Sequence, residues 1–124
     1  MKEKITTSLA PTPGGRFSQG LKVGNRIYVA GTTPLNVETG TIPESIEDQT
    51  KQVLSNIEHV LQAGGASLSD VVKVTVHLAD INDFDAFNAV YDEYFSEPLP
   101  VRTTVGSQLK GFKVEIDVIA EIDY

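Results

Sequence analysis

The sequence predicts an α+β protein, a two-layer sandwich in which two helices cover one face of a mixed β-sheet. Two observations predict this class. In several short stretches apolar residues alternate at a period of two, as in half-buried strands. In two longer stretches the period changes to that of an amphipathic helix. The predicted order is β-β-α-β-α-β-β, with four to five strands in the sheet.

A chain of 124 residues is long enough for one core and too short for two, so residues 1–124 are expected to form a single domain. No apolar run approaches the roughly 18 residues that a membrane-spanning helix needs. Residues 1–7 are charged but lead into no apolar block, which argues against a secretory signal. We therefore expect a cytoplasmic location.

The first elements are a Pro/Gly-rich lead-in over residues 8–20 and a β-hairpin. The lead-in composition is typical of an irregular segment that follows the surface. Leu21 and Val23 then alternate with polar neighbours, and Gly24-Asn25 is suited to a two-residue turn into a second strand over residues 26–30.

Two helices are predicted. The first begins at Ser45, which is suited to cap it with Asp48 three residues on, and ends at Gly64-Gly65. Its apolar residues have helical spacing: Ile46, Val53, Leu54, Ile57, Val60 and Leu61. The second helix follows a cap at Asn82 or Asp83. Its apolar face, which we interpret as core and not as a surface for stacking bases, comprises Phe84, Phe87, Val90, Tyr91, Tyr94 and Phe95.

Three further strands are predicted over residues 71–78, 101–105 and 114–122. In the first of them the expected core side consists of Val72, Val74, Val76 and Leu78, with Lys73, Thr75 and His77 on the other side. In the last strand the core side consists of Val114, Ile116, Val118, Ala120 and Ile122, with Glu115, Asp117, Ile119 and Glu121 opposite. Ile119 and Tyr28 then fall on a face that two helices leave uncovered. Uncovered apolar sheet surface favours self-association, so we expect an oligomer.

Composition narrows the range of functions. The absence of cysteine excludes disulfides, thiolate zinc sites and a cysteine nucleophile. The formal charge of −7, without any run of basic residues, argues against nucleic-acid binding. His59 and His77 have no second ligand at metal spacing, so we interpret both as solvated or hydrogen-bonded residues and expect no metal.

Arg102 is the one cation of a strand-like segment between Pro100 and Gly106. If Val101, Thr103 and Val105 face the core, Arg102 and Thr104 face the open side of the sheet. Taken alone, an ion pair with one of the many acidic side chains is the simpler interpretation. The alternative is that the guanidinium binds a planar carboxylate through two parallel N–H···O bonds.

Glu115 has the same parity on the terminal strand, which we expect to lie next to that of Arg102, so both are expected to border one cleft. An ion pair with Arg102 or Lys113 is one interpretation of Glu115. The other is that its carboxylate holds and activates a water molecule as a general base.

Five segments, in order and at plausible spacing, resemble the RidA (YjgF) family of reactive-intermediate deaminases. They are Gly15-Arg16-Phe17-Ser18-Gln19-Gly20, Ile27-Tyr28-Val29-Ala30-Gly31-Thr32, Asn88-Ala89-Val90-Tyr91, Pro100-Val101-Arg102-Thr103 and Val114-Glu115-Ile116-Asp117-Val118-Ile119-Ala120. The resemblance covers nearly the whole chain, and the Pro-x-Arg-[Ser/Thr] and Glu-Ile-[Glu/Asp]-x-Ile-Ala blocks are specific.

The resemblance implies a chorismate-mutase-like fold assembled as a homotrimer around a central β-barrel, with three clefts between subunits. It also implies cofactor-free hydrolysis of 2-imino acids, such as 2-iminopropanoate and 2-iminobutanoate, to 2-oxo acids and ammonia. On this resemblance Arg102 binds the substrate carboxylate, aided by the Gly31 N–H, and Glu115 positions the attacking water. The pocket is expected to be lined by Phe17, Asn88 and the backbone of Thr104.

Four positions depart from the family. Phe17 stands where many members have Tyr, Ala30 and Thr32 where Ser and Gln are common, and Thr104 where Cys is frequent. The Phe17 and Ala30 changes leave one alternative open, a non-catalytic protein that binds small carboxylates or regulates a partner on the same trimer. A third hypothesis is a ribonuclease, an activity ascribed to some relatives. The acidic charge makes the ribonuclease the least favoured.

Overall fold

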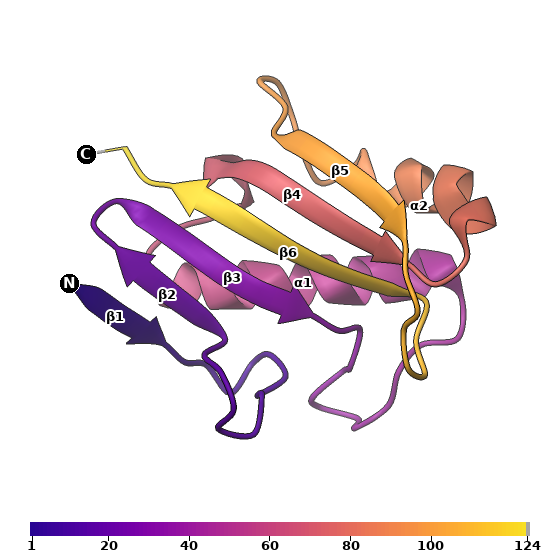
Figure 1. Ribbon diagram of the computed structural model, residues 1–124, viewed down its shortest axis with the longest axis horizontal. Helices are drawn as coiled ribbons and strands as arrows, with labels where there is room; N and C mark the ends of the chain where they lie inside the picture. Colours follow the sequence, from indigo (N-terminus) through magenta and orange to yellow (C-terminus); the bar gives the residue numbers. More distant parts are fainter. Residues whose placement is uncertain (124) are drawn as a thin grey trace.

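The computed structural model describes residues 1–123 and has the predicted two-layer architecture (Figure 1). Six strands form one mixed sheet in the order β1-β2-β3-β6-β4-β5. Both helices, α1 (Ile46–Ala63) and α2 (Phe84–Tyr91), lie behind the sheet in Figure 1 and leave its front face open. The strands are β1 (Lys2–Ile5), β2 (Gly20–Val23), β3 (Arg26–Thr32), β4 (Val71–Leu78), β5 (Val101–Gly106) and β6 (Val114–Glu121).

The predicted hairpin is confirmed. β2 and β3 pair antiparallel, with Val23 opposite Arg26, and Gly24 in the turn takes a φ of +61°. β3 then pairs with β6, and β6 with β4, both antiparallel, whereas β4 and the edge strand β5 run parallel. The C-terminal strand β6 is therefore the centre of the sheet.

The edge strand β1 was not predicted, and the sheet has six strands where four to five were expected. Its sequence, Lys-Glu-Lys-Ile, contains three charged residues, and only Ile5 is buried. An edge strand needs hydrogen bonds from one neighbour only, so it forms without the apolar alternation by which strands are recognised.

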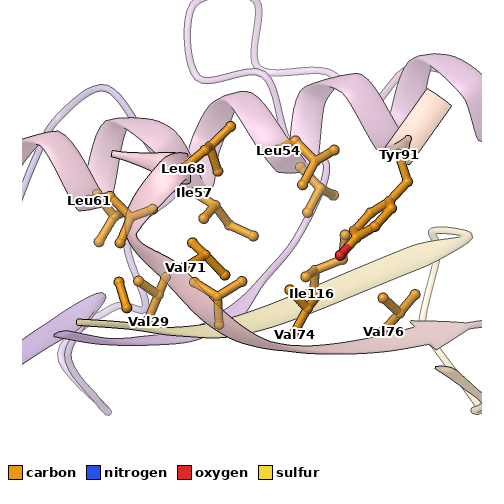
Figure 2. Close-up of a cluster of buried hydrophobic side chains, with 14 of the residues drawn as sticks. Val29, Leu54, Ile57, Leu61, Leu68, Val71, Val74, Val76, Tyr91 and Ile116 are labelled. Atoms are coloured by element: carbon orange, nitrogen blue, oxygen red, sulfur yellow. The ribbon is translucent and has the colours of Figure 1, made fainter. Parts of the chain in front are cut away.

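Helix α1 begins and ends as predicted. The Ser45 Oγ accepts a hydrogen bond of 3.0 Å from the Asp48 backbone N–H, which caps the first turn. Beyond the last turn Gly65 takes a φ of +88°. The apolar stripe of α1, including Leu54, Ile57 and Leu61, points at the sheet and forms the core with it (Figure 2). Burial of each such side chain contributes about 1.5–3 kcal/mol to the stability of the folded state.

Helix α2 is shorter than predicted. It ends at Tyr91, and Tyr94 and Phe95 lie beyond it, although both still pack partly buried against the core. Asp83, one of the two predicted cap residues, is the N-cap residue of α2, but its side chain makes no capping hydrogen bond. Instead the Asp80 Oδ1 accepts from the Asn82 backbone N–H at 2.9 Å and starts a short 3₁₀ turn, Ile81–Asp83, that leads into α2.

The predicted face of Val72 was wrong because the pairing of β4 with β6 shifts between Val71 and Lys73. Val71 is 5% exposed and belongs to the core, whereas Val72 is 40% exposed. Such a bulge places one extra residue in the strand and changes the parity on either side of it. From Val74 onward the alternation is as predicted.

The lead-in is irregular, as expected, but one buried side chain holds it in place. Gln19 is 6% exposed, and its Oε1 accepts from the Thr7 N–H at 2.7 Å. Its Nε2 lies at hydrogen-bond distance from the carbonyls of Thr7, Ala10 and Pro11, at 3.1, 3.1 and 2.8 Å. Gln19 thus joins both ends of the segment that carries Phe17.

We predict that Gln19→Ala lowers the free energy of unfolding by about 2 kcal/mol, because several buried backbone groups lose their partner. Urea denaturation at fixed protein concentration measures this effect. Tryptic cleavage after Arg16, in the lead-in, should become faster in the variant, as read by mass spectrometry. Gln62→Ala, on the exposed face of α1, is the matched control and should change neither property. Equal cleavage rates in both variants would show that Gln19 does not hold the lead-in.

Candidate functional site

Arg102 faces the helices and not the open side of the sheet, so its predicted orientation was wrong. Val101 and Val105 are exposed, and Arg102 and Thr104 are half-buried. In the parallel pairing Arg102 lies opposite Val74 and Thr104 opposite Val76, both of which are core residues. The valines of β5 therefore mark the open face of the sheet, and Arg102 and Thr104 face the helix layer.

The guanidinium of Arg102 lies among three aromatic rings. Its Cζ is 4.7 Å from the ring centroid of Tyr91, 5.5 Å from that of Phe87 and 5.7 Å from that of Phe84. Within residues 1–123 Arg102 makes no ion pair, because the described pairs are Arg26–Glu121 and His77–Asp117. The rings attract the cation without neutralising its charge. The interpretation of Arg102 as a surface ion pair is thus not supported.

A cavity of about 580 Å³ opens beside this guanidinium. Its lining combines the last turn of α2 with the segment that leads into β5: Asn88, Tyr91, Asp92, Phe95, Ser96, Glu97, Leu99, Pro100 and Arg102. Three buried polar atoms around Arg102 have no hydrogen-bond partner among the described residues, namely Asn88 Oδ1, Tyr91 Oη and Thr104 Oγ1. Buried polar atoms are nearly always paired, so three orphans around one cation are typical of a site that a ligand or ordered water completes.

Tyr91 was predicted as a core residue and missed as a site residue. Its ring extends from α2 toward the sheet (Figure 2), yet it also lines the cavity beneath Arg102. Burial raises the pKa of the Tyr91 hydroxyl, and the charge of Arg102 acts in the opposite direction. One signal could have identified it: Tyr91 lies three residues after Asn88, so both occupy one side of α2.

Glu115 lies on the open face of β6, as predicted, and contacts β3. A Cβ added to Gly31 would lie 2.9 Å from the Glu115 Oε2, so the absence of a side chain there lets the carboxylate approach the strand. The pairing of β3 with β6 is irregular between Val29 and Thr32, next to this contact. Bulges beside functional residues often re-aim side chains.

Phe17 lies near Gly31 but not packed in the core. It is 58% exposed, and together with Ala30, Gly31 and Thr32 it lines a small pocket of about 100 Å³. Three of the four positions that depart from the family pattern therefore line one pocket: Phe17, Ala30 and Thr32.

The expectation that Arg102 and Glu115 lie on adjacent strands with the same orientation was wrong. They lie on opposite faces of the sheet, and β4 separates β5 from β6. One chain therefore carries two separate clusters of the predicted site residues. We call Asn88, Tyr91, Arg102 and Thr104 the arginine half-site, and Gly31 and Glu115 the glutamate half-site. Phe17 lines the small pocket beside Gly31.

Both histidines are hydrogen bonded. The His59 Nδ1 lies 3.1 Å from the Leu9 carbonyl oxygen, and the His77 Nδ1 lies 2.8 Å from the Ser107 Oγ. In the described part of the chain no three His, Asp or Glu side chains are grouped so as to hold a metal ion. No helix of residues 1–123 is both long and apolar enough to cross a membrane.

These features define a small α+β protein in which Arg102 lies among aromatic rings beside a cavity and makes no ion pair within residues 1–123. A family model described as Endoribonuclease L-PSP matches residues 7–122. A RutC family protein of Pyrococcus abyssi is 52% identical over 122 residues, 96% of each chain. A 2-iminobutanoate/2-iminopropanoate deaminase of Dermatophagoides farinae is 42% identical, covering 98% of each. The chain belongs to the RidA (YjgF) family, as its motifs predicted.

Solved structures agree with this family. RidA from an Antarctic Psychrobacter has a TM-score of 0.91 and 39% identity, covering 97% of this chain and 99% of that one. Escherichia coli TdcF with bound serine has a TM-score of 0.90 and 33% identity, covering 98% and 99%. The α+β fold of this chain is therefore that of RidA proteins.

We predict that Arg102→Lys weakens binding of a small 2-oxo acid such as pyruvate by about tenfold or more. The lysine ammonium keeps the charge but cannot stack on the rings or donate two parallel hydrogen bonds. Isothermal titration calorimetry measures the affinity. Arg26→Lys, in which an exposed arginine paired with Glu121 is changed in the same way, should bind like the parent protein. Equal affinity of the Arg102 variant would exclude the guanidinium as the carboxylate-binding group.

Proposed function

We propose that this protein hydrolyses 2-imino acids, such as 2-iminopropanoate and 2-iminobutanoate, to 2-oxo acids and ammonia without a cofactor. The observation that carries the proposal is the unpaired Arg102 guanidinium beside a cavity with three orphaned buried polar atoms. The relative from Dermatophagoides farinae is named for this activity at 42% identity. A 2-imino acid offers the planar carboxylate that such a guanidinium binds best.

We propose further that two copies of the chain complete each site, as in the homotrimer that the family resemblance implies. The arginine half-site lies at the β5 edge of the sheet, and the glutamate half-site lies on the open face. An unpaired sheet edge and exposed apolar residues on that face, among them Tyr28, Val101 and Val105, favour contact with another copy. The arginine half-site of one copy would then face the glutamate half-site of the next.

In this mechanism Arg102 binds the carboxylate, and the Gly31 N–H helps to orient the substrate. The substrate reacts as the protonated imine. Glu115 accepts a proton from water as the water oxygen forms a bond to the imine carbon, and the C=N electron pair moves to nitrogen, which becomes an amine. The resulting carboxylic acid gives that proton to the amine of the tetrahedral intermediate. The C–N bond then breaks and ammonia leaves, as the hydroxyl group returns its proton to Glu115 and the carbon–oxygen double bond forms. Holding water and imine carbon in contact removes much of the entropic barrier.

The departures from the family make the small pocket beside Gly31 less polar, because Phe17 and Ala30 offer no hydroxyl. Arg102 and Glu115 are both present, and these two groups perform the steps above. We therefore assign the departures to substrate preference and not to loss of the reaction.

The proposal is tested by a coupled assay in which threonine dehydratase generates 2-iminobutanoate and semicarbazide traps it. The protein should lower semicarbazone formation, and Arg102→Ala should abolish this effect. Equal semicarbazone formation with and without the protein, or full activity of Arg102→Ala, would contradict it. The alternative of a non-catalytic carboxylate-binding protein predicts that a 2-oxo acid binds, as measured by calorimetry, while the rate of imine decay stays unchanged.

A second prediction concerns Gly31. Gly31→Ala should lower kcat about tenfold or more with little change in thermal stability, because the new Cβ displaces the mobile end of Glu115 and not a packed backbone. Since alanine keeps the backbone N–H, the loss would come from the carboxylate. Gly106→Ala is the matched control, because its Cβ would meet its nearest neighbour at 3.9 Å, an ordinary contact. An unchanged kcat in Gly31→Ala would argue against Glu115 as the base.

A further inference from the structure

Tyr91 is the middle ring of an aromatic column at the end of α2. Its ring centroid lies 5.4 Å from that of Phe87 and 4.7 Å from that of Phe95, with interplanar angles of 33° and 32°. Residues four apart are neighbours on the surface of a helix, which brings Phe87 and Tyr91 to one side of α2. Tyr91 is only 6% exposed, so its neighbours leave the ring little room to turn.

This column connects the hydrophobic core to the cavity. Phe87 is fully buried, whereas Tyr91 and Phe95 line the cavity of about 580 Å³. Among the three rings around the Arg102 guanidinium, that of Tyr91 is the closest, with its centroid 4.7 Å from Cζ. Of these three ring-bearing residues of the described chain, Tyr91 alone also lines the cavity. Tyr91 therefore joins a fixed part of the core to the cation at the cavity.

The Tyr91 ring leaves the charge of Arg102 available to a ligand. Burial raises the pKa of the Tyr91 hydroxyl above its usual value, and this effect exceeds the opposing effect of the Arg102 charge. The charge of Asp92 acts in the same direction as burial. Tyr91 is thus a neutral phenol in neutral solution, and no tyrosinate cancels the charge of the guanidinium.

A ring suits this position better than an acidic side chain. A carboxylate would occupy the N–H donors of the guanidinium and cancel the charge on which ligand binding depends. An aromatic ring attracts the cation and leaves its charge in place, so the N–H donors remain available to a ligand. In the described chain Arg102 has three rings beside it and no ion pair, which is the arrangement expected of a guanidinium held ready for an anion.

We propose that Tyr91 is a positioning residue, whose ring holds the Arg102 guanidinium at the cavity and so prepares it to bind the substrate carboxylate. This inference rests on the proposed function and deepens it, because it assigns the placement of the carboxylate-binding group to a residue of α2. Ordering a long, flexible side chain on binding reduces affinity. A ring that orders the guanidinium before the ligand arrives removes much of this loss.

The test compares the affinity of the parent protein, Tyr91→Leu and Tyr91→Phe for pyruvate by isothermal titration calorimetry. Tyr91→Leu removes the ring, so its dissociation constant should rise about fivefold or more. Tyr91→Phe keeps the ring and should recover most of the affinity that the leucine variant loses. Equal affinity of Tyr91→Leu and the parent, or an equal loss in both variants, would overturn the inference. So would the absence of pyruvate binding by the parent protein.

Tyr94→Leu is the matched control. Tyr94 also packs partly buried against the core, but it does not belong to the residues that line the cavity of the described chain. The same substitution there removes a ring of the same size and should leave the affinity for pyruvate unchanged. A loss in Tyr94→Leu as large as that in Tyr91→Leu would reveal a general effect of packing and refute the role of Tyr91. If urea denaturation shows that Tyr91→Leu does not fold, Tyr91→Met, which removes the ring with a more adaptable side chain, takes its place.

The kinetics of imine hydrolysis give a second readout. The carboxylate is held in both the ground state and the transition state, so Tyr91→Leu should raise KM about fivefold or more and leave kcat within about twofold. A fall in kcat with KM unchanged would contradict a role in carboxylate binding. If the parent hydrolyses no imine, the proposed function fails, and the pyruvate affinities still decide the role of Tyr91. If the parent hydrolyses imines and Tyr91→Leu matches it in KM and in pyruvate affinity, the inference fails and the proposed function stands.

Discussion

The alternation of side chains along a β-strand is the constraint on which the whole site depends. It places Arg102 of β5 over the aromatic side of α2 and Glu115 of β6 on the opposite face. No side-chain rotation moves a residue through a hydrogen-bonded sheet, so one copy cannot bring these two groups together. A reaction that needs both must use two copies. For the proposed reaction, oligomerisation is then a precondition of catalysis.

The arginine half-site lacks ion pairs and hydrogen bonds that a ligand could supply. An arginine over three rings has lost part of its hydration, and in the described chain it gains no carboxylate in return. Orphaned polar atoms on Asn88, Tyr91 and Thr104 add to this deficit. In the proposed function a bound carboxylate satisfies the guanidinium, and small side-chain rotations or ordered water pair the remaining polar atoms. Interactions that folding leaves unmade would then contribute to the free energy of binding.

How far the sequence predicts this protein depends on how strongly each segment is buried. Helix α1 and strands β3 and β6 are correctly predicted because their apolar periods are long and uninterrupted. The edge strands were the failures: β1 has almost no apolar alternation, and in β5 the valines lie on the open face. The family motifs identified Arg102 and Glu115 as candidate site residues. Their placement on opposite faces was not predictable, because an exposed valine and a buried one look alike in a sequence.

The open face of the sheet has to meet two demands that conflict. Contact between copies favours an apolar surface, and Tyr28, Val101 and Val105 provide it. Holding an ionised carboxylate favours a polar one, because an unpaired charge is costly to bury. Strand β6 meets both demands along its length, with Ile119 paired to Tyr28 at one end and Glu115 opposite His77 at the other. Separating the polar end from the apolar end leaves an apolar surface for the proposed contact with a second copy and keeps Glu115 away from it.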